Sequence, residues 1–178
     1  MWACKLFGDI YLYRRYASVM PEPESPHWLT PAEQRSWRAY LAMTSRLSAI
    51  QGRQLQALHG ISIQDFQVLV NVSEAETGCI RTSDLADAVV WERSRLSHHL
   101  ARMEKRGLIR RDACPHDGRG VLVSLTDKGH EILEQAAPDH VDLVRRVFID
   151  ILGTDGLDKL DDVTSAVLAA IDQEPDPA

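Results

Sequence analysis

The sequence predicts a mainly α-helical fold with a small β-hairpin, in which a winged helix-turn-helix is flanked by long dimerisation helices. Amphipathic stretches with apolar residues at three- and four-residue steps fill most of the chain, and two β-like segments enclose a turn-forming stretch. The expected order is helix, helix, small strand, helix, helix, hairpin, helix, helix. We therefore divide the chain into an N-terminal extension and linker (1–29), a first dimerisation helix (30–60), a winged helix-turn-helix domain (61–126) and C-terminal dimerisation helices (127–174).

The N-terminal extension does not have the pattern of a signal peptide. Asp9 breaks its apolar stretch, and the basic pair Arg14-Arg15 follows that stretch instead of preceding it. Residues 21–26 are polar and rich in proline, which excludes a helix there. We interpret Met20 as the possible true start of the protein and residues 1–19 as an upstream extension.

The first two helices have recognisable starts. Thr30, Pro31 and Glu33 form the pattern of an N-cap, a first-turn proline and a capping-box acid, and the helix is expected to end near Gly60. Ser62 and Asp65 begin the second helix. Its expected inner face is Phe66, Leu69 and Val70.

The remaining elements follow from local signals. We expect an edge strand at 79–81, a short helix capped within 82–84, a helix from about 92 to 106, and two strands at 108–114 and 121–125. Thr126 caps the next helix, which Pro138 should kink or interrupt. Thr154 and Asp155 start the last helix. The apolar stripes of the long helices predict packing on each other or on a second chain.

The helix expected at 92–106 has two distinct faces. At about 100° per residue, Leu96, Leu100 and Met103 lie on one side, which we expect to be buried. The opposite side carries Ser94, Arg95, His98, Arg102 and Lys105, and the flanks carry Ser97 and His99, which suit phosphate contacts or packing. Base edges in the major groove present donors and acceptors, and arginine pairs bidentately with guanine. This face therefore suits a recognition helix; the alternative is a solvent-exposed basic helix.

The expected hairpin carries an arginine at its tip. Arg119 lies between Gly118 and Gly120, and Asp117 is two residues before it. A wing arginine can enter the minor groove, and Asp117 could orient its guanidinium through a charge-assisted pair. The alternative is a turn that this pair stabilises without any DNA.

Charge is segregated along the chain. The net charge is -6, but residues 79–128 carry +3 and residues 129–178 carry -9. Between Trp91 and Arg111 there are seven basic residues and two acidic ones. Such a stripe is either the footprint of a polyanion or a solvated helix face.

The ordered set of motifs resembles the MarR family of winged-helix transcription regulators over about residues 30–172. The motifs are Thr82-Ser83-Asp84-Leu85-Ala86, Arg93-Ser94-Arg95-Leu96-Ser97-His98-His99-Leu100, Met103-Glu104-Lys105-Arg106-Gly107-Leu108-Ile109, Asp117-Gly118-Arg119 and Leu125-Thr126-Asp127-Lys128-Gly129. One departure is the turn before the reading helix, which often carries Gly in relatives and reads Val89-Val90-Trp91 here.

The resemblance implies a homodimer clamped by its first and last two helices on double-stranded DNA with a palindromic operator. It implies that Ser94, Arg95, Ser97 and His98 lie on the groove-reading helix and Arg119 on the wing tip. It also implies a small-molecule effector bound between the first helices and the winged domain. The aromatic residues of that neighbourhood are Trp37, Tyr40 and Phe66; the alternative is that all three belong to the core.

Enzymatic and metal-dependent functions lack their signatures. The chain has no G-x-x-x-x-G-K-[ST], G-x-S-x-G or H-E-x-x-H motif, so we expect no enzyme, no cofactor and no metal. Three cysteines without a C-x-x-C pattern fit a reducing cytoplasm. Cys79 and Cys114 are interpreted as structural thiols, with oxidant sensing as the alternative. No apolar run is long enough to span a membrane.

The sequence thus predicts a dimeric, sequence-specific DNA-binding regulator, expected to be a repressor that a small aromatic ligand releases. The alternative is a winged-helix protein-interaction module that has lost DNA binding. The arginines on the exposed helix face and at the wing favour the first hypothesis.

Overall fold

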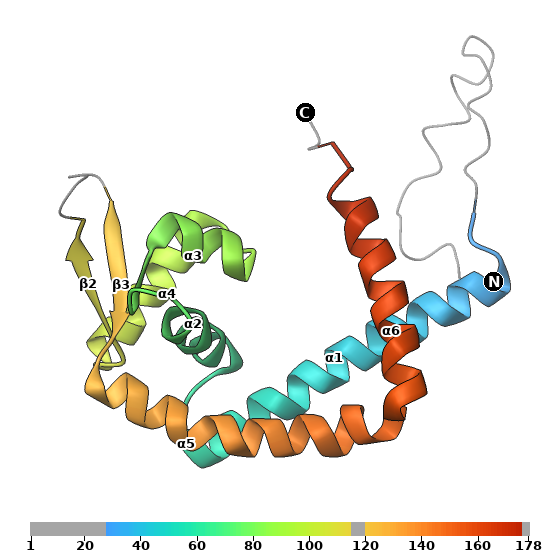
Figure 1. Ribbon diagram of the computed structural model, residues 1–178, viewed down its shortest axis with the longest axis horizontal. Coiled ribbons are helices and arrows are strands. Elements are labelled where there is room, and N and C mark those ends of the chain that lie inside the picture. The colour runs from blue at the N-terminus through green and yellow to red at the C-terminus, as the bar shows by residue number, and fades with distance from the viewer. Residues whose placement is uncertain (1–27, 115–119, 176–178) are drawn as a thin grey trace, which may run out of the picture. The chain divides into compact units, whose positions relative to one another are not determined.

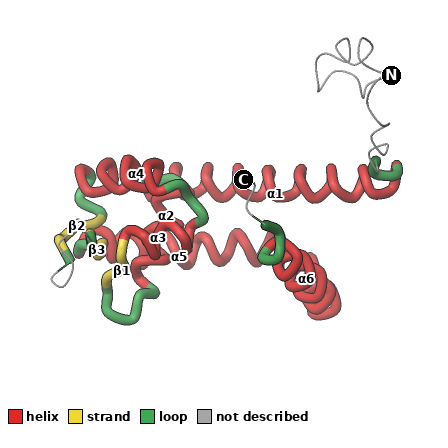
Figure 2. Tube along the Cα trace, turned by 90° about the horizontal axis from the view of Figure 1, so that it is seen from above, coloured by secondary structure: helices red, strands yellow, loops and turns green. Residues whose placement is uncertain are grey.

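The computed structural model describes residues 28–114 and 120–175. The chain divides into two compact units, residues 1–44 and 45–178. Helices predominate, and the sheet is a small antiparallel one with three strands (Figures 1 and 2). The predicted fold class is therefore confirmed.

Helix α1 (Pro31–His59) begins as the sequence predicts. Thr30 N–H donates to Glu33 Oε2 at 2.6 Å, and Glu33 N–H donates to Thr30 Oγ1 at 3.3 Å. This reciprocal pair satisfies two of the free N–H groups at a helix start.

The second unit holds the winged helix-turn-helix elements and the last two long helices. The elements after α1 are α2 (Ile63–Ser73), β1 (Cys79–Arg81), α3 (Thr82–Val89), α4 (Arg93–Lys105), β2 (Ile109–Ala113), β3 (Val121–Leu125), α5 (Asp127–Val144), the π-helical segment η3 (Arg145–Ile149) and α6 (Asp150–Ile171). Strand β3 lies between β1 and β2, and Val123 pairs with Ile80 on one side and Arg111 on the other.

One hydrophobic core joins α2, α3, α4 and the sheet. Its buried side chains come from the end of α1, from α2, α3, α4, β2 and β3, and from the middle of α5, which fixes α4 against α2 and α3. The buried members are Leu55, Ile61, Phe66, Val68, Leu69, Val72, Leu85, Ala86, Leu96, Leu100, Met103, Leu108, Ile109, Val123 and Ala136. The end of α1 also contacts α5, because His59 Nε2 lies 2.9 Å from Asp139 Oδ2.

Two local expectations need correction. The hydroxyl of Thr82 does not cap α3; residue 81 is the N-cap, and Thr82 Oγ1 instead donates to Val121 O in β3 at 3.1 Å. Helix α5 runs through Pro138 without interruption. The break comes later, at Gly153, whose φ of 60° is non-helical within α6, and the predicted start at Thr154 lies just after it. Helix α6 turns away from α5 here (Figure 1).

The turn between α3 and α4 contains a strained residue. Val90 adopts the left-handed conformation, with φ 54° and ψ 49°, at the position where the sequence departs from the family that it resembles. A β-branched side chain is disfavoured there, whereas Gly is not. Val90 is 88% exposed, so removal of its side chain loses few packing contacts.

We expect Val90→Gly to raise the free energy of unfolding by about 1 kcal/mol, because the left-handed strain disappears. Ala88→Gly, on the exposed side of α3, is the control and should lower it by about 0.5–1 kcal/mol. Urea unfolding of the three proteins measures both changes. Destabilisation by Val90→Gly as large as that by Ala88→Gly would contradict the assignment of strain.

The start of α5 is fixed to the end of α4. Thr126 Oγ1 caps α5 by accepting from Gly129 N–H at 3.1 Å and donates to Gly107 O at 2.6 Å. Lys128 Nζ donates to Arg106 O at 2.9 Å. Gly129 itself packs so closely on the Leu108 carbonyl that a Cβ there would overlap the oxygen. The recognition-helix candidate and the long helix α5 therefore share one rigid corner.

Candidate nucleic-acid interface

Helix α4 presents one buried face and one polar exposed face. Leu96, Leu100 and Met103 are all 0% exposed and pack in the core, as the sequence predicts. The side chains predicted to read or contact DNA are all exposed: Ser94, Arg95, Ser97, His98, Arg102 and Lys105. The arrangement supplies donors and positive charge along one side of an otherwise firmly anchored helix.

An aromatic residue organises the N-terminal end of this face. The guanidinium of Arg95 lies over the ring of Trp91, 4.7 Å from its centroid, in cation–π geometry. The same ring meets His99 edge-on, with the centroids 5.3 Å apart and the planes at 90°. His99, expected on a flank, is 8% exposed and serves packing rather than phosphate contact.

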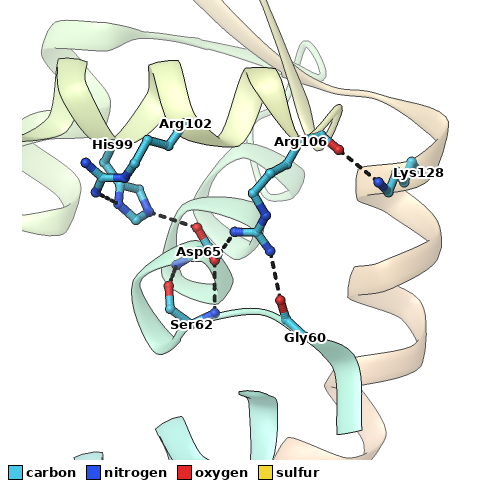
Figure 3. Close-up of polar contacts among 7 residues, drawn as sticks. All are labelled: Gly60, Ser62, Asp65, His99, Arg102, Arg106 and Lys128. Carbon is cyan, nitrogen blue, oxygen red and sulfur yellow. Dashed lines mark hydrogen bonds and ion pairs between the residues drawn. The ribbon is translucent and has the colours of Figure 1, made fainter. Parts of the chain in front are cut away.

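Asp65, on the first turn of α2, is the centre of a buried polar cluster beneath α4 (Figure 3). Its Oδ1 lies 3.0 Å from His99 Nε2, and its Oδ2 accepts from Arg106 Nη1 at 2.6 Å and from Ser62 N–H at 2.9 Å. Arg106 also donates to Gly60 O at 2.8 Å. A single carboxylate thus completes the cap of α2 and contacts two further side chains, His99 within α4 and Arg106 at its C-terminal cap.

The charge state of Asp65 follows from these contacts. Burial raises the pKa of its carboxyl, but the hydrogen bonds from His99, Ser62 and Arg106 outweigh that effect. The pKa of Asp65 consequently lies well below its usual range. The carboxylate is ionised at neutral pH and remains a strong acceptor.

The predicted basic stripe is smaller than the sequence indicates. Three of its seven basic side chains form ion pairs with carboxylates of the same chain. These pairs are Arg106 with Asp65, Arg110 with Asp112 and Arg111 with Glu104, each at 2.6 Å. The positive charge of the exposed α4 face therefore rests mainly on Arg93, Arg95, Arg102 and Lys105.

Arg102 combines exposure with an internal contact. It is exposed, as predicted, and its Nη2 also lies 3.0 Å from His99 Nδ1. Sequence reasoning missed this contact, together with the roles of Trp91, Asp65 and Arg106. The available signal was the capping-box acid of α2, but its partners on α4 are far along the chain.

The predicted wing residues Asp117 and Arg119 lie outside the described residues. The strands that lead to them are paired as far as Ala113 and Val121, and Cys114 N–H donates to Gly120 O at 2.8 Å. The base of the wing is thus a regular hairpin. The roles of its tip stay predictions.

The three aromatics predicted to bind a ligand are in different environments. Phe66 is 6% exposed, belongs to the core and packs on His140 with ring centroids 4.6 Å apart. Trp37 and Tyr40 stack on each other at 5.6 Å in the first unit and are each 52% exposed. The interpretation of all three as core residues is therefore correct only for Phe66.

An open pocket lies elsewhere, between the end of α1, the start of α2 and α4. Its volume is about 610 Å³, and its wall includes Trp91, Arg95, His99, Arg102 and Arg106.

Cys79 is half-buried and Cys114 buried, both as free thiols. Within residues 28–114 and 120–175, no group of three metal-ligating side chains occurs, and no helix is long and apolar enough to cross a membrane.

Comparisons with known proteins agree on one family. A model of the MarR family matches residues 59–120. AbsC, a MarR family transcriptional regulator from Streptomyces coelicolor, is 39% identical with a TM-score of 0.79, over 83% of this chain and 99% of that one.

Two further relatives extend the comparison. Sco3205, a MarR family transcriptional regulator from the same organism, was solved in complex with DNA; it is 38% identical over 83% of this chain and 92% of its own, with a TM-score of 0.78. The transcriptional repressor MprA of Escherichia coli is 29% identical over 76% of each chain. The fold, the helix order and this similarity over most of the chain place the protein in the MarR family of transcriptional regulators, not among enzymes.

Proposed function

We propose that the protein is a dimeric, sequence-specific DNA-binding regulator that acts as a repressor. The observation that carries this proposal is the exposed face of α4. It places Arg95, His98 and Arg102 opposite a fully buried apolar face, directly after the short helix α3. In helix-turn-helix proteins the second helix enters the major groove with its N-terminal residues at the base edges.

Similar proteins support the DNA partner and the direction of regulation. Sco3205 binds DNA in its crystal structure, and a MarR mutant of E. coli, 27% identical over 74% of this chain, was solved with operator DNA. MprA is named a repressor. We infer the same class of partner and effect for this chain.

Exposed apolar side chains support the homodimer. Helix α6 carries large apolar residues that are at least half exposed in the single chain: Ile151, Val163, Val167, Leu168 and Ile171. Patches of this kind mark interfaces. A two-fold dimer would bind a palindromic operator, because operator symmetry mirrors protein symmetry.

We propose that the effector binds in the pocket beside α4. An anionic aromatic ligand there would contact Arg95 and Arg102, which are also proposed DNA contacts, and would compete with DNA for them. Benzoate should then release the bound duplex from the protein. Retention of the duplex at saturating benzoate would reject this ligand class.

Two substitutions separate base reading from charge attraction. Arg95 is near the start of α4, so Arg95→Ala should narrow the affinity gap between operator and random DNA, by about 1–3 kcal/mol. Lys105 ends α4 and should reach phosphate, so Lys105→Ala should weaken both DNAs about equally and reduce the salt slope by about one unit.

Fluorescence anisotropy titrations at several salt concentrations measure both effects. Arg119→Ala, at the predicted wing tip, serves as a third variant and should weaken binding without altering the fold. An identical, uniform loss for Arg95→Ala and Lys105→Ala would show that α4 is an electrostatic clamp without a reading role.

A further inference from the structure

We propose that His99 is a positioning residue for DNA recognition: anchored by Asp65 of α2, it holds the guanidinium of Arg102 at the exposed face of α4 (Figure 3). The inference rests on the proposed DNA-binding function and deepens it. It assigns a specificity role to a buried side chain that cannot itself touch a base.

The contacts of the ring fix its tautomer. A guanidinium has donors only, so His99 Nδ1, 3.0 Å from Arg102 Nη2, must present its lone pair. The ring proton is then on Nε2, which faces Asp65 Oδ1 at 3.0 Å. This assignment follows from the partners, because the guanidinium can only donate and the carboxylate can only accept.

The anchor of the relay is rigid. The side chain of Asp65 is 5% exposed, and its other oxygen is held by Arg106 and by the N–H of Ser62. The Trp91 ring packs against another side of His99 at 90°, and Arg95 stacks on that ring. Because the imidazole is held on these sides, its Nδ1 offers Arg102 a fixed acceptor.

Arg102 remains able to bind DNA while it makes this contact. Only one of its five N–H groups is directed to His99, and the residue is exposed. Restricting a long side chain before association reduces the entropy lost on binding. A restrained guanidinium also discriminates better between correctly and wrongly placed acceptors on base edges.

A double-mutant cycle tests the relay. In the wild-type background, His99→Leu keeps an apolar side chain in the buried position and should weaken operator binding about fivefold to tenfold. In an Arg102→Ala background the same substitution should change the affinity less than about twofold, because its target is already absent. Anisotropy titrations with the full-length chain, at one salt concentration, give all four affinities.

Two controls distinguish positioning from general support of α4. In an Arg95→Ala background, His99→Leu should retain its full effect. His99→Gln should restore most of the affinity, because its amide can donate to Asp65 and accept from Arg102. Thermal unfolding of each variant confirms that the proteins are folded at the assay temperature.

The contrary outcomes are distinct. An equal loss from His99→Leu in both the wild-type and Arg102→Ala backgrounds would show a merely structural role, and tighter binding by His99→Leu would show that His99 withholds Arg102 from DNA. Either result overturns this inference while DNA binding stands. A wild-type chain that binds no duplex would overturn the DNA-binding proposal and the relay with it.

Discussion

Gly129→Ala is expected to lower the free energy of unfolding by about 3 kcal/mol. The added Cβ would overlap the backbone carbonyl of Leu108, which cannot move aside as a flexible side chain could. That carbonyl also accepts from Thr126 N–H at 3.2 Å, so displacement would break the corner between α4 and α5.

Gly52→Ala is the matched control. A Cβ at Gly52, in helix α1, would meet only Ile63 at 4.0 Å, which is ordinary contact, and Ala is the better helix former. We expect it to stabilise the protein by up to about 1 kcal/mol. Chemical denaturation compares both variants with the wild type; a neutral Gly129→Ala would contradict the close packing of this corner.

Asp65→Ala is expected to cost about 2–3 kcal/mol of stability. The substitution removes the acceptor for Arg106, His99 and the Ser62 N–H at once. Loss of one partner of a buried ion pair commonly costs more, but the side chain of Arg106 is 42% exposed, so water can solvate the released guanidinium. Asp112→Ala, whose partner Arg110 is 69% exposed, should cost less than about 1 kcal/mol and serves as the control.

The Asp65 contribution should depend on pH with a definite sign. Its folded pKa is lowered, so the native state binds fewer protons at this carboxyl than the unfolded state does in acid. The stabilisation is then complete above about pH 5 and declines as the pH falls below about 4, the unfolded value. We expect the stability gap between wild type and Asp65→Ala to be constant from pH 7 to 5 and to shrink towards pH 3. A gap that stays constant to pH 3 would contradict the lowered pKa.

Local signals in the sequence predicted much of the fold. The helix starts at Thr30 and Ser62 depend on residues three positions apart, and both form as predicted, each with a capping box. The two faces of α4 follow from the helical period alone, which places Leu96, Leu100 and Met103 together. Such features need no knowledge of tertiary packing.

The rest depends on contacts between distant residues. The cap of α2 alone explains the presence of an acid at position 65. Its second role, the contacts with His99 and Arg106, therefore has no local sequence signature. Similarly, the spacing of Trp37 and Tyr40 indicates an apolar face without indicating what covers it. The ion pair between Arg110 and Asp112 could have been predicted from the sequence, because residues two apart share one face of a strand.

Selection of bound sites from random duplex DNA by the full-length protein tests the central claim most directly. We expect enrichment of one sequence with two-fold symmetry, whose half-sites are centred one helical turn, or ~10 base pairs, apart. Arg95→Ala should lose the preference at the base pair that Arg95 reads while still binding DNA. Two results would contradict the assignment of α4 as a recognition helix. The protein could retain random duplexes without enriching any sequence, or it could retain no duplex at all.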